Sequence, residues 1–295
     1  MPHSLPNSWL RNGWTIWHAL GAALMAGLGL LATFDAWRDI YHIAARDEES
    51  SQVYVVPVVL AWLLWVRRRR LRKCRPRGLY IGPAIAALGW LLYWVGDLRL
   101  IQSFWHGGAV LVAVGCLFSV LGSDVLKQFL PALATLVFLV PVPGRIRQQV
   151  AIPLGAITAQ ITQQLFLLMG VAVERSGNLL SINKVDVTIA EACNGLRMVF
   201  SLVMVCFAFA FGTPLRWYSR LLVLVASPIA AVVCNIIRLV PTLYLYGHIS
   251  RTRADWFHDT AGWIMLPIAF LMLMGILRLL RWALVPVTEF TLAYD

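Results

Sequence analysis

The chain has 295 residues, of which 60% are hydrophobic and only 13% are charged. Soluble domains are about half apolar and about a quarter charged, so this composition excludes a soluble globular protein and indicates an integral membrane protein. The formal net charge of +11 does not indicate a nucleic-acid partner, because the basic residues gather in one run beside an apolar segment rather than on a folded basic surface.

Eight segments are apolar and long enough to cross a bilayer, for which a helix needs roughly 20 residues. These segments are 14–34, 49–66, 79–96, 103–122, 125–141, 193–212, 218–247 and 261–284. No hydrophilic block is long enough for a soluble domain, and no cleavable signal peptide is expected before the first span. The sequence therefore predicts an all-α, polytopic transmembrane helical bundle that forms a single integral membrane domain over 1–295.

The basic run RRRRLRKCRPR (67–77) directly follows an apolar segment. Such a run is typical of a cytoplasmic loop that faces anionic lipid head groups, so the bilayer is an expected partner. Counting spans from this run places the N-terminus inside and the loop 35–50, which is acidic on balance, outside.

The weaker apolar stretch 150–173 leaves the later topology open, because the number of inner Lys and Arg residues is the same whether or not it spans. Gln160, Gln163 and Gln164 fall on one helical face, which suits an interfacial or re-entrant helix. We therefore predict eight spans with both termini inside. Residues 174–190 would then lie outside, where turn signals and the alternating Val185 and Val187 predict a short hairpin that could hold an extended peptide.

The five cysteines match neither a disulfide framework nor a metal site, and we expect neither a metal nor another cofactor. Cys116, Cys206 and Cys234 are expected to be apolar packing residues. Cys193 differs, because it lies where a helix begins and the helix dipole favours the thiolate.

The neighbours of Cys193 suit acyl chemistry. The backbone N–H groups of Asn194 and Gly195 could point at a developing oxyanion. Glu191 and Arg197 could orient this shell, and the alternative for them is a solvated salt bridge.

Arg238 lies inside an apolar run, where an ionisable group is costly and usually faces a partner or a water-filled cavity. The alternatives are a structural ion pair or a side chain that snorkels to the interface. Asn235, one turn earlier, is a candidate hydrogen-bonding support. His258, beside Asp259, comes in the loop before the last span, and His248 in the same loop competes with it.

Either topology brings Cys193, the far part of 218–247 and His258 to one membrane face. A thiol, an imidazole and a guanidinium supply a nucleophile, a proton carrier and a cation, which suffice for acyl transfer. The alternative is a non-enzymatic transporter or polysaccharide-export component in which Arg238 lines a solute path. That function would need polar residues at mid-depth in several spans, whereas here they gather near one rim.

Three motifs together resemble the exosortase/archaeosortase family of membrane cysteine transpeptidases. EACNGLR resembles the Cys motif of that family, NIIRLV its Asn-x-x-Arg motif and FHDTAGW its His motif. The block 47–70 and the stretches VPVPGRI and GVAVERSGNLLSI extend the likeness over most of 35–275, with the active-site half at about 174–275. Two positions depart from the pattern: Gln52 replaces the usual histidine after Ser51, and Asn194 replaces the more usual serine.

The resemblance implies a sortase-like thiol protease or transpeptidase in the cytoplasmic (inner) membrane, with its active site near the extracytoplasmic face. Its substrates would be exported proteins with a C-terminal tail made of a short motif, a membrane helix and a basic cluster. Cys193 would form a thioester, His258 would shuttle protons, and Arg238 would stabilise the oxyanion or orient the thiolate. An acceptor nucleophile or water, between which the sequence does not decide, would release the product.

Overall fold

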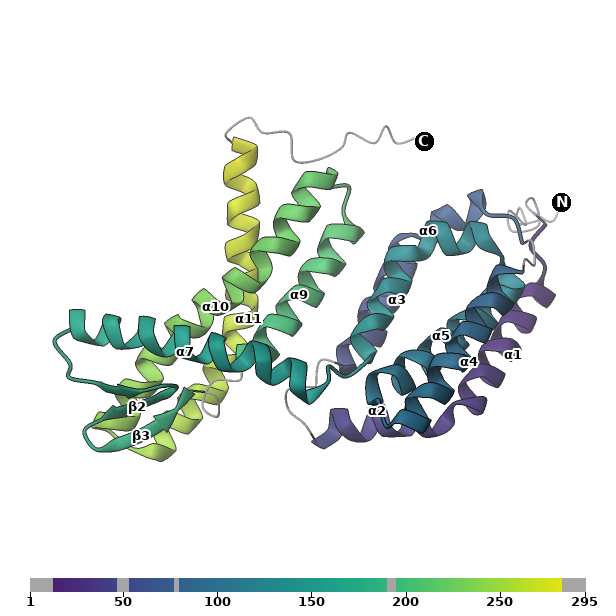
Figure 1. Ribbon diagram of the computed structural model, residues 1–295. Helices are drawn as coiled ribbons and strands as arrows, with labels where there is room; N and C mark the ends of the chain where they lie inside the picture. Colours follow the sequence, from purple (N-terminus) through teal and green to yellow (C-terminus); the bar gives the residue numbers. More distant parts are fainter. Residues whose placement is uncertain (1–12, 47–52, 77–79, 190–194, 283–295) are drawn as a thin grey trace. The chain divides into compact units, whose positions relative to one another are not determined.

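The computed structural model describes residues 13–46, 53–76, 80–189 and 195–282 and consists almost entirely of helices (Figure 1). The all-α membrane fold predicted from the sequence is confirmed. The chain divides into two compact units, Met1–Pro143 and Gly144–Asp295, each of which is described by itself. That 1–295 forms one domain stays a prediction.

Each of the eight predicted segments contains a helix. The first unit contains α1 (Ile16–Ala32), α2 (Phe34–Arg46), α3 (Val56–Val66), the 3₁₀ helix η3 (Arg68–Lys73), α4 (Ile81–Arg99), α5 (Gln102–Leu121), α6 (Ser123–Ala134) and the 3₁₀ helix η4 (Thr135–Leu139). The second contains α7 (Gly144–Leu168), the strands β1 (Glu174–Ser176), β2 (Leu179–Ile182) and β3 (Val185–Thr188), and the helices α9 (Gly195–Gly212), α10 (Trp217–His248) and α11 (Arg251–Trp282).

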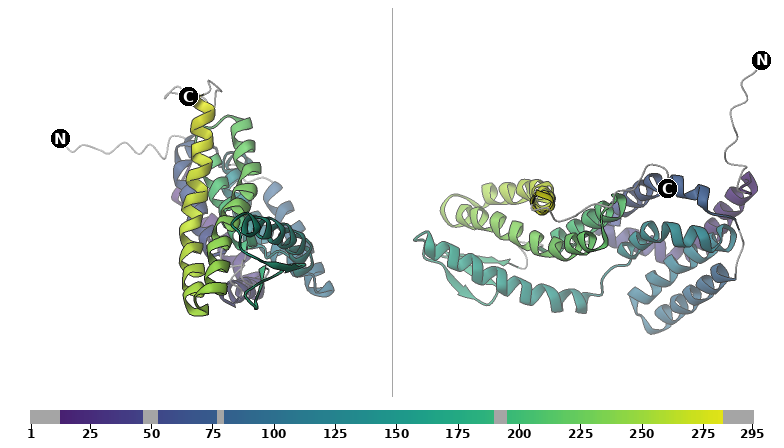
Figure 2. Two further views of the ribbon diagram at one scale, coloured as in Figure 1. Left: turned by 90° about the vertical axis from the view of Figure 1, so that its left-hand side faces the viewer. Right: turned by 90° about the horizontal axis from the view of Figure 1, so that it is seen from above.

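The predicted count of eight spans is not confirmed. In the described part of the chain, five helices are long and apolar enough to cross a membrane, namely α4, α5, α7, α10 and α11. The pair α1 and α2 would add a sixth, although it is bent by 75°. α3 and α6 are shorter, and α6 contains Pro131 and ends in η4. α7 is long and apolar enough to span a membrane, but it lies crosswise to α11 (Figures 1 and 2). That α7 is an interfacial or re-entrant helix stays a prediction.

The predicted outer loop 35–50 is wrong for its first part, because residues 34–46 form the helix α2. The physical reason is an amphipathic spacing of four that buries Ala36, Ile40 and Ala44 on one face. From the same helix, Asp39 reaches the fully buried His106 of α5, with 2.9 Å between Oδ2 and Nε2. The Asp39 charge that we assigned to an aqueous loop is therefore in contact with a buried histidine.

α4 and α5 pack with their backbones in contact, and glycine makes this possible. A Cβ at Gly96 would lie 2.2 Å from the backbone nitrogen of Trp105, and one at Gly108 would lie 2.3 Å from that of Tyr93. The α4 glycines recur every seven residues, at 82, 89 and 96, and so form one stripe. Because lipid tails are as apolar as the side chains, such close packing is a main source of stability between membrane helices.

In the second unit, α9, α10 and α11 pack side by side (Figure 2). Their shared core includes Met198 of α9, Cys234 of α10 and Ala269 of α11. Cys206 and Cys234 are buried there, as expected of packing residues. The predicted hairpin is present and gains a third strand, giving an antiparallel sheet of order β1-β2-β3.

One side of the sheet packs between α7 and the second half of α10 (Figure 1). Leu180 and Ile182 of β2 share this core with Phe166 of α7 and Leu239 of α10. Asn183, in the turn after β2, donates from Nδ2 to the carbonyl oxygen of Gly247, at 3.1 Å. The sheet is therefore fixed to the end of α10.

The glycine contact predicts the effect of one added methyl group. Gly108→Ala should push α5 away from Tyr93 and cost about 1–3 kcal/mol, the typical range for overpacking. Gly27→Ala is the matched control, because nothing lies within 4 Å of a Cβ at that helical position. The measurement is the thermal midpoint of the detergent-solubilised protein. Equal midpoints for the two variants would contradict the described α4–α5 packing.

Candidate functional site

Arg238 is a buried cation in the second unit, with only 7% of its surface exposed. Its Nη2 donates to Oδ1 of Asn235, one turn earlier in α10, at 3.0 Å. Its Nε has no hydrogen-bond acceptor among the described residues. Its burial excludes a side chain that snorkels into water. No described carboxylate lies within salt-bridge distance, so a structural ion pair with these residues is excluded too.

The guanidinium of Arg238 reaches across to α11 at Gly262. A Cβ built on Gly262 would lie 2.8 Å from Nη1 of Arg238, so the missing side chain makes room for the cation. His258 lies four residues before Gly262 and therefore on the same face of α11. Sequence reasoning missed Gly262, because its role depends on the arginine of a neighbouring helix.

His258 is half-buried and lies within α11, which begins at Arg251. The expectation that His258 lies in a loop before the last span is therefore wrong. The polar residues from Arg251 onward form the first turns of α11. Hydropathy identifies only the apolar part of this helix, which begins later. Alanines at the buried positions 254, 261 and 269 follow the same face. That face packs on α10, so the helix directs His258 toward the side of α10 that carries Arg238.

Glu191, Cys193 and Asn194 lie outside the described residues, as does the side chain of Arg197. α9 is described from Gly195 onward, so the predicted helix start at Cys193 stays a prediction.

The described flanks of the Cys193 segment are both attached to α10. Before it, Ile189 is 2% exposed and belongs to the core that contains Leu239 and Leu243. After it, Met198 is 6% exposed and belongs to the core that contains Cys234. Leu239 and Cys234 lie on either side of Arg238 along the helix. The described residues Ile189 and Met198 thus both pack on α10, in cores that lie on either side of Arg238 along the helix.

The competing histidine, His248, occupies a different position. It is the last residue of α10, is exposed, and stacks on Tyr244 with ring centroids 4.3 Å apart. It lies ten residues beyond Arg238, or about 15 Å along the helix axis. Asp259 is exposed beside His258. The positions along α10 and α11 therefore favour His258 over His248 as the partner of Arg238.

Cys74 is a poor competitor for Cys193. Cys74 lies outside the spans and is fully buried. Burial raises the pKa of its thiol, and the charge of Asp124 raises it further, so the thiol stays protonated. Among the described residues, no group of three or more His, Cys, Asp or Glu side chains is placed to hold a metal ion.

The family model for transmembrane exosortases matches residues 37–275, a range that includes Cys193, Arg238 and His258. The chain belongs to the transmembrane exosortase family. No curated protein and no solved structure matches it. Membership supports a general role for this exosortase as a multi-pass membrane transpeptidase or protease that processes exported proteins.

The contact at Gly262 predicts a variant that displaces the cation and preserves the fold. Gly262→Ala should move only the flexible end of Arg238, so the thermal midpoint should stay close to that of the wild type. Processing of an exported substrate should fall by about a hundredfold, the loss that a shift of about 1 Å in a catalytic group can cause.

Gly275→Ala is the control in the same helix, because nothing lies within 4 Å of a Cβ there. The measurement is the rate of processing in membranes at matched protein levels. If both alanine variants process at the wild-type rate, the position of the guanidinium against Gly262 does not matter for activity.

Proposed function

We propose that this exosortase is a thiol transpeptidase or protease that removes the C-terminal tail of exported proteins through a thioester at Cys193. The observation that carries the proposal is the buried guanidinium of Arg238. It has one amide partner and no carboxylate among the described residues, and it lies against α11 one turn from His258. A cation in such a place stabilises negative charge that develops during a reaction.

In the proposed first step, the Cys193 thiolate attacks the scissile carbonyl carbon. The resulting oxyanion is stabilised by Arg238, with Asn235 holding the guanidinium and the backbone N–H groups of Asn194 and Gly195 as further donors. The carbon–nitrogen bond then breaks, and His258 gives a proton to the leaving amine, which leaves the acyl group on sulfur as a thioester. Glu191, Arg197 and Asp259 support this shell.

In the second step, an acceptor nucleophile or water attacks the thioester carbonyl, and His258 takes up its proton. The carbon–sulfur bond breaks and the Cys193 thiolate returns. A transpeptidase and a hydrolytic protease therefore share the first step and differ only in the acceptor.

We also propose that the substrate approaches along the sheet. β3 is an edge strand. Ile189 donates its N–H to the carbonyl oxygen of Asn178 at 2.9 Å, so these two residues form a hydrogen-bonded pair. Along an antiparallel strand, every second residue makes such a pair with its neighbour strand, and the backbone N–H and C=O groups of Asp186 and Thr188 therefore face away from β2. An extended segment that pairs with this edge would run toward Cys193, five residues beyond Thr188 in the chain.

The proposed substrates are exported proteins with a C-terminal motif, a membrane helix and a basic cluster, and the proposed site lies near the extracytoplasmic face of the cytoplasmic membrane. Membership of the exosortase family favours this enzyme over the alternative of a transporter in which Arg238 lines a solute path.

The proposal predicts which side chains are indispensable. Cys193→Ala should abolish tail removal, and Cys193→Ser should nearly abolish it, because a neutral hydroxyl lacks the activation of a thiolate. His258→Ala should lose about a hundredfold to ten-thousandfold in rate, the typical contribution of general acid–base catalysis. The measurement is the loss of the tail from a substrate protein, followed by immunoblot in membranes.

Two controls accompany these variants. His248→Ala should process at close to the wild-type rate, since His248 stacks on Tyr244 at the far end of α10. Cys116→Ala should also remain active. Processing by Cys193→Ala, or a dead His248→Ala beside an active His258→Ala, would refute the assignment of roles.

A further inference from the structure

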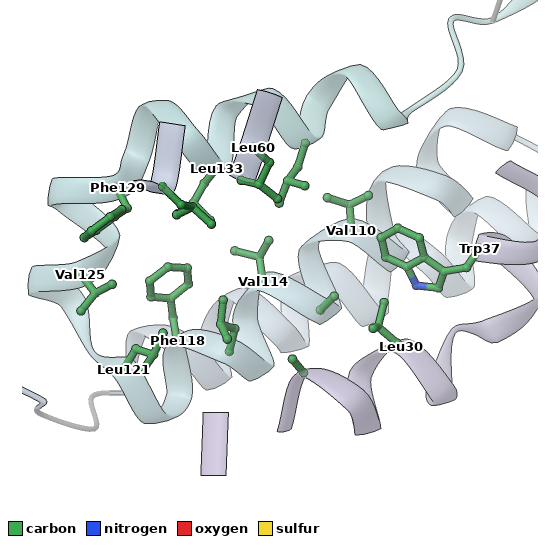
Figure 3. Close-up of a pocket in the computed structure, with 15 residues that line it drawn as sticks. Leu30, Trp37, Leu60, Val110, Val114, Phe118, Leu121, Val125, Phe129 and Leu133 are labelled. Atoms are coloured by element: carbon green, nitrogen blue, oxygen red, sulfur yellow. The ribbon is translucent and has the colours of Figure 1, made fainter. Parts of the chain in front are cut away.

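The first unit contains an apolar cavity of about 360 Å³ between α5 and the helices α1, α3 and α6 (Figure 3). All of its lining side chains are apolar except for the indole of Trp37, whose Nε1 already donates to Oγ1 of Thr33 at 3.0 Å. Water in a cavity needs several polar partners, which this lining does not supply. The cavity therefore suits a hydrocarbon occupant.

The length of the cavity matches one leaflet of a bilayer. Its lining follows α5 from Val110 to Leu121, or about 16 Å of helix at 1.5 Å per residue. The hydrocarbon core of a bilayer is about 30 Å thick, so one leaflet is about 15 Å deep. A single acyl chain lying along α5 would fill this length.

One end of the cavity adjoins the basic turn η3. Phe118 and Phe129 line the cavity and belong to a core cluster with Cys74, which directly follows η3. Leu71 of η3 packs against the same cluster. Arg69, Arg70, Arg72 and Lys73 of this turn are exposed. The buried Arg67 donates from Nη1 to the carbonyl oxygen of Gln128 in α6, at 3.1 Å, and so ties the basic turn to a lining helix.

We propose that this cavity binds one acyl chain of an anionic phospholipid whose phosphate lies on the η3 turn. The apolar lining takes the chain, and the basic side chains attract the negative head group at the same end of the cavity. The site lies entirely in the first unit and does not depend on the function proposed for Cys193.

The charge of η3 argues against the tail of a substrate as the occupant of the cavity. The basic cluster proposed for that tail would be repelled by the exposed basic side chains of η3.

The test is native mass spectrometry of the full chain after reconstitution in nanodiscs of equal parts phosphatidylglycerol and phosphatidylcholine. The wild type should retain one phosphatidylglycerol per chain after extraction into mild detergent. Val114→Phe, which fills the cavity from α5, should lose it. Val58→Phe is the matched control, because Val58 is 67% exposed on α3 and does not line the cavity.

The head group is tested separately. The double variant Arg69→Gln and Arg70→Gln should retain phosphatidylcholine as readily as phosphatidylglycerol, whereas Arg251→Gln with Arg253→Gln in α11 should keep the wild-type preference. Leu133→Phe fills the same cavity from α6 and serves if Val114→Phe does not fold. Three results would overturn the proposal: the folded filling variants retain phosphatidylglycerol, the wild type retains both lipids equally, or a peptide is found in place of the lipid. Cys193→Ala should retain the lipid like the wild type, so this result and the failure of tail removal are distinguishable.

Discussion

The arrangement of the second unit depends on a buried guanidinium that has little to neutralise it. Burying a charge is costly, and removing one partner of a buried ion pair typically costs about 3–5 kcal/mol because the other charge is left uncompensated. Arg238 is held by the amide of Asn235 and has no carboxylate partner among the described residues. The same constraint makes it chemically useful, because an anion that forms beside it during a reaction is stabilised more strongly than in water.

The elements around Arg238 are positioned by their contacts with α10. α11 lacks a side chain at Gly262, where the guanidinium arrives, and presents His258 one turn away. The sheet fixes Ile189 to the core around Leu239, and α9 fixes Met198 to the core around Cys234. In the first unit glycine has another role, since Gly96 and Gly108 allow backbone contact between α4 and α5. Missing side chains therefore allow backbone contact between helices in the first unit and make room for a cation in the second.

The sequence was sufficient to predict the helices, because the length of an apolar run is a local signal. It was also sufficient to select the polar residues of the proposed chemistry, because a charge inside an apolar run is a local signal too. It failed where tertiary contacts decide. The charges of α2 resembled those of an aqueous loop, yet Asp39 meets the buried His106. The first turns of α11 were assigned to a loop, because hydropathy marks the apolar part of a helix and not its beginning. Gly262 gave no signal by itself, since its importance depends on the arginine of a neighbouring helix.

We propose that the Arg238 cation acts on Cys193 both before and during the reaction, by stabilising the thiolate and then the oxyanion. The direct measurement is the pH dependence of Cys193 alkylation by iodoacetamide, followed by peptide mass spectrometry. An ordinary thiol has a pKa of about 8.5, and a nearby cation together with a helix N-terminus lowers it. We expect wild-type Cys193 to react with a pKa well below that value, and Arg238→Gln to raise that pKa. The same alkylation profile in the wild type and in Arg238→Gln would contradict the account.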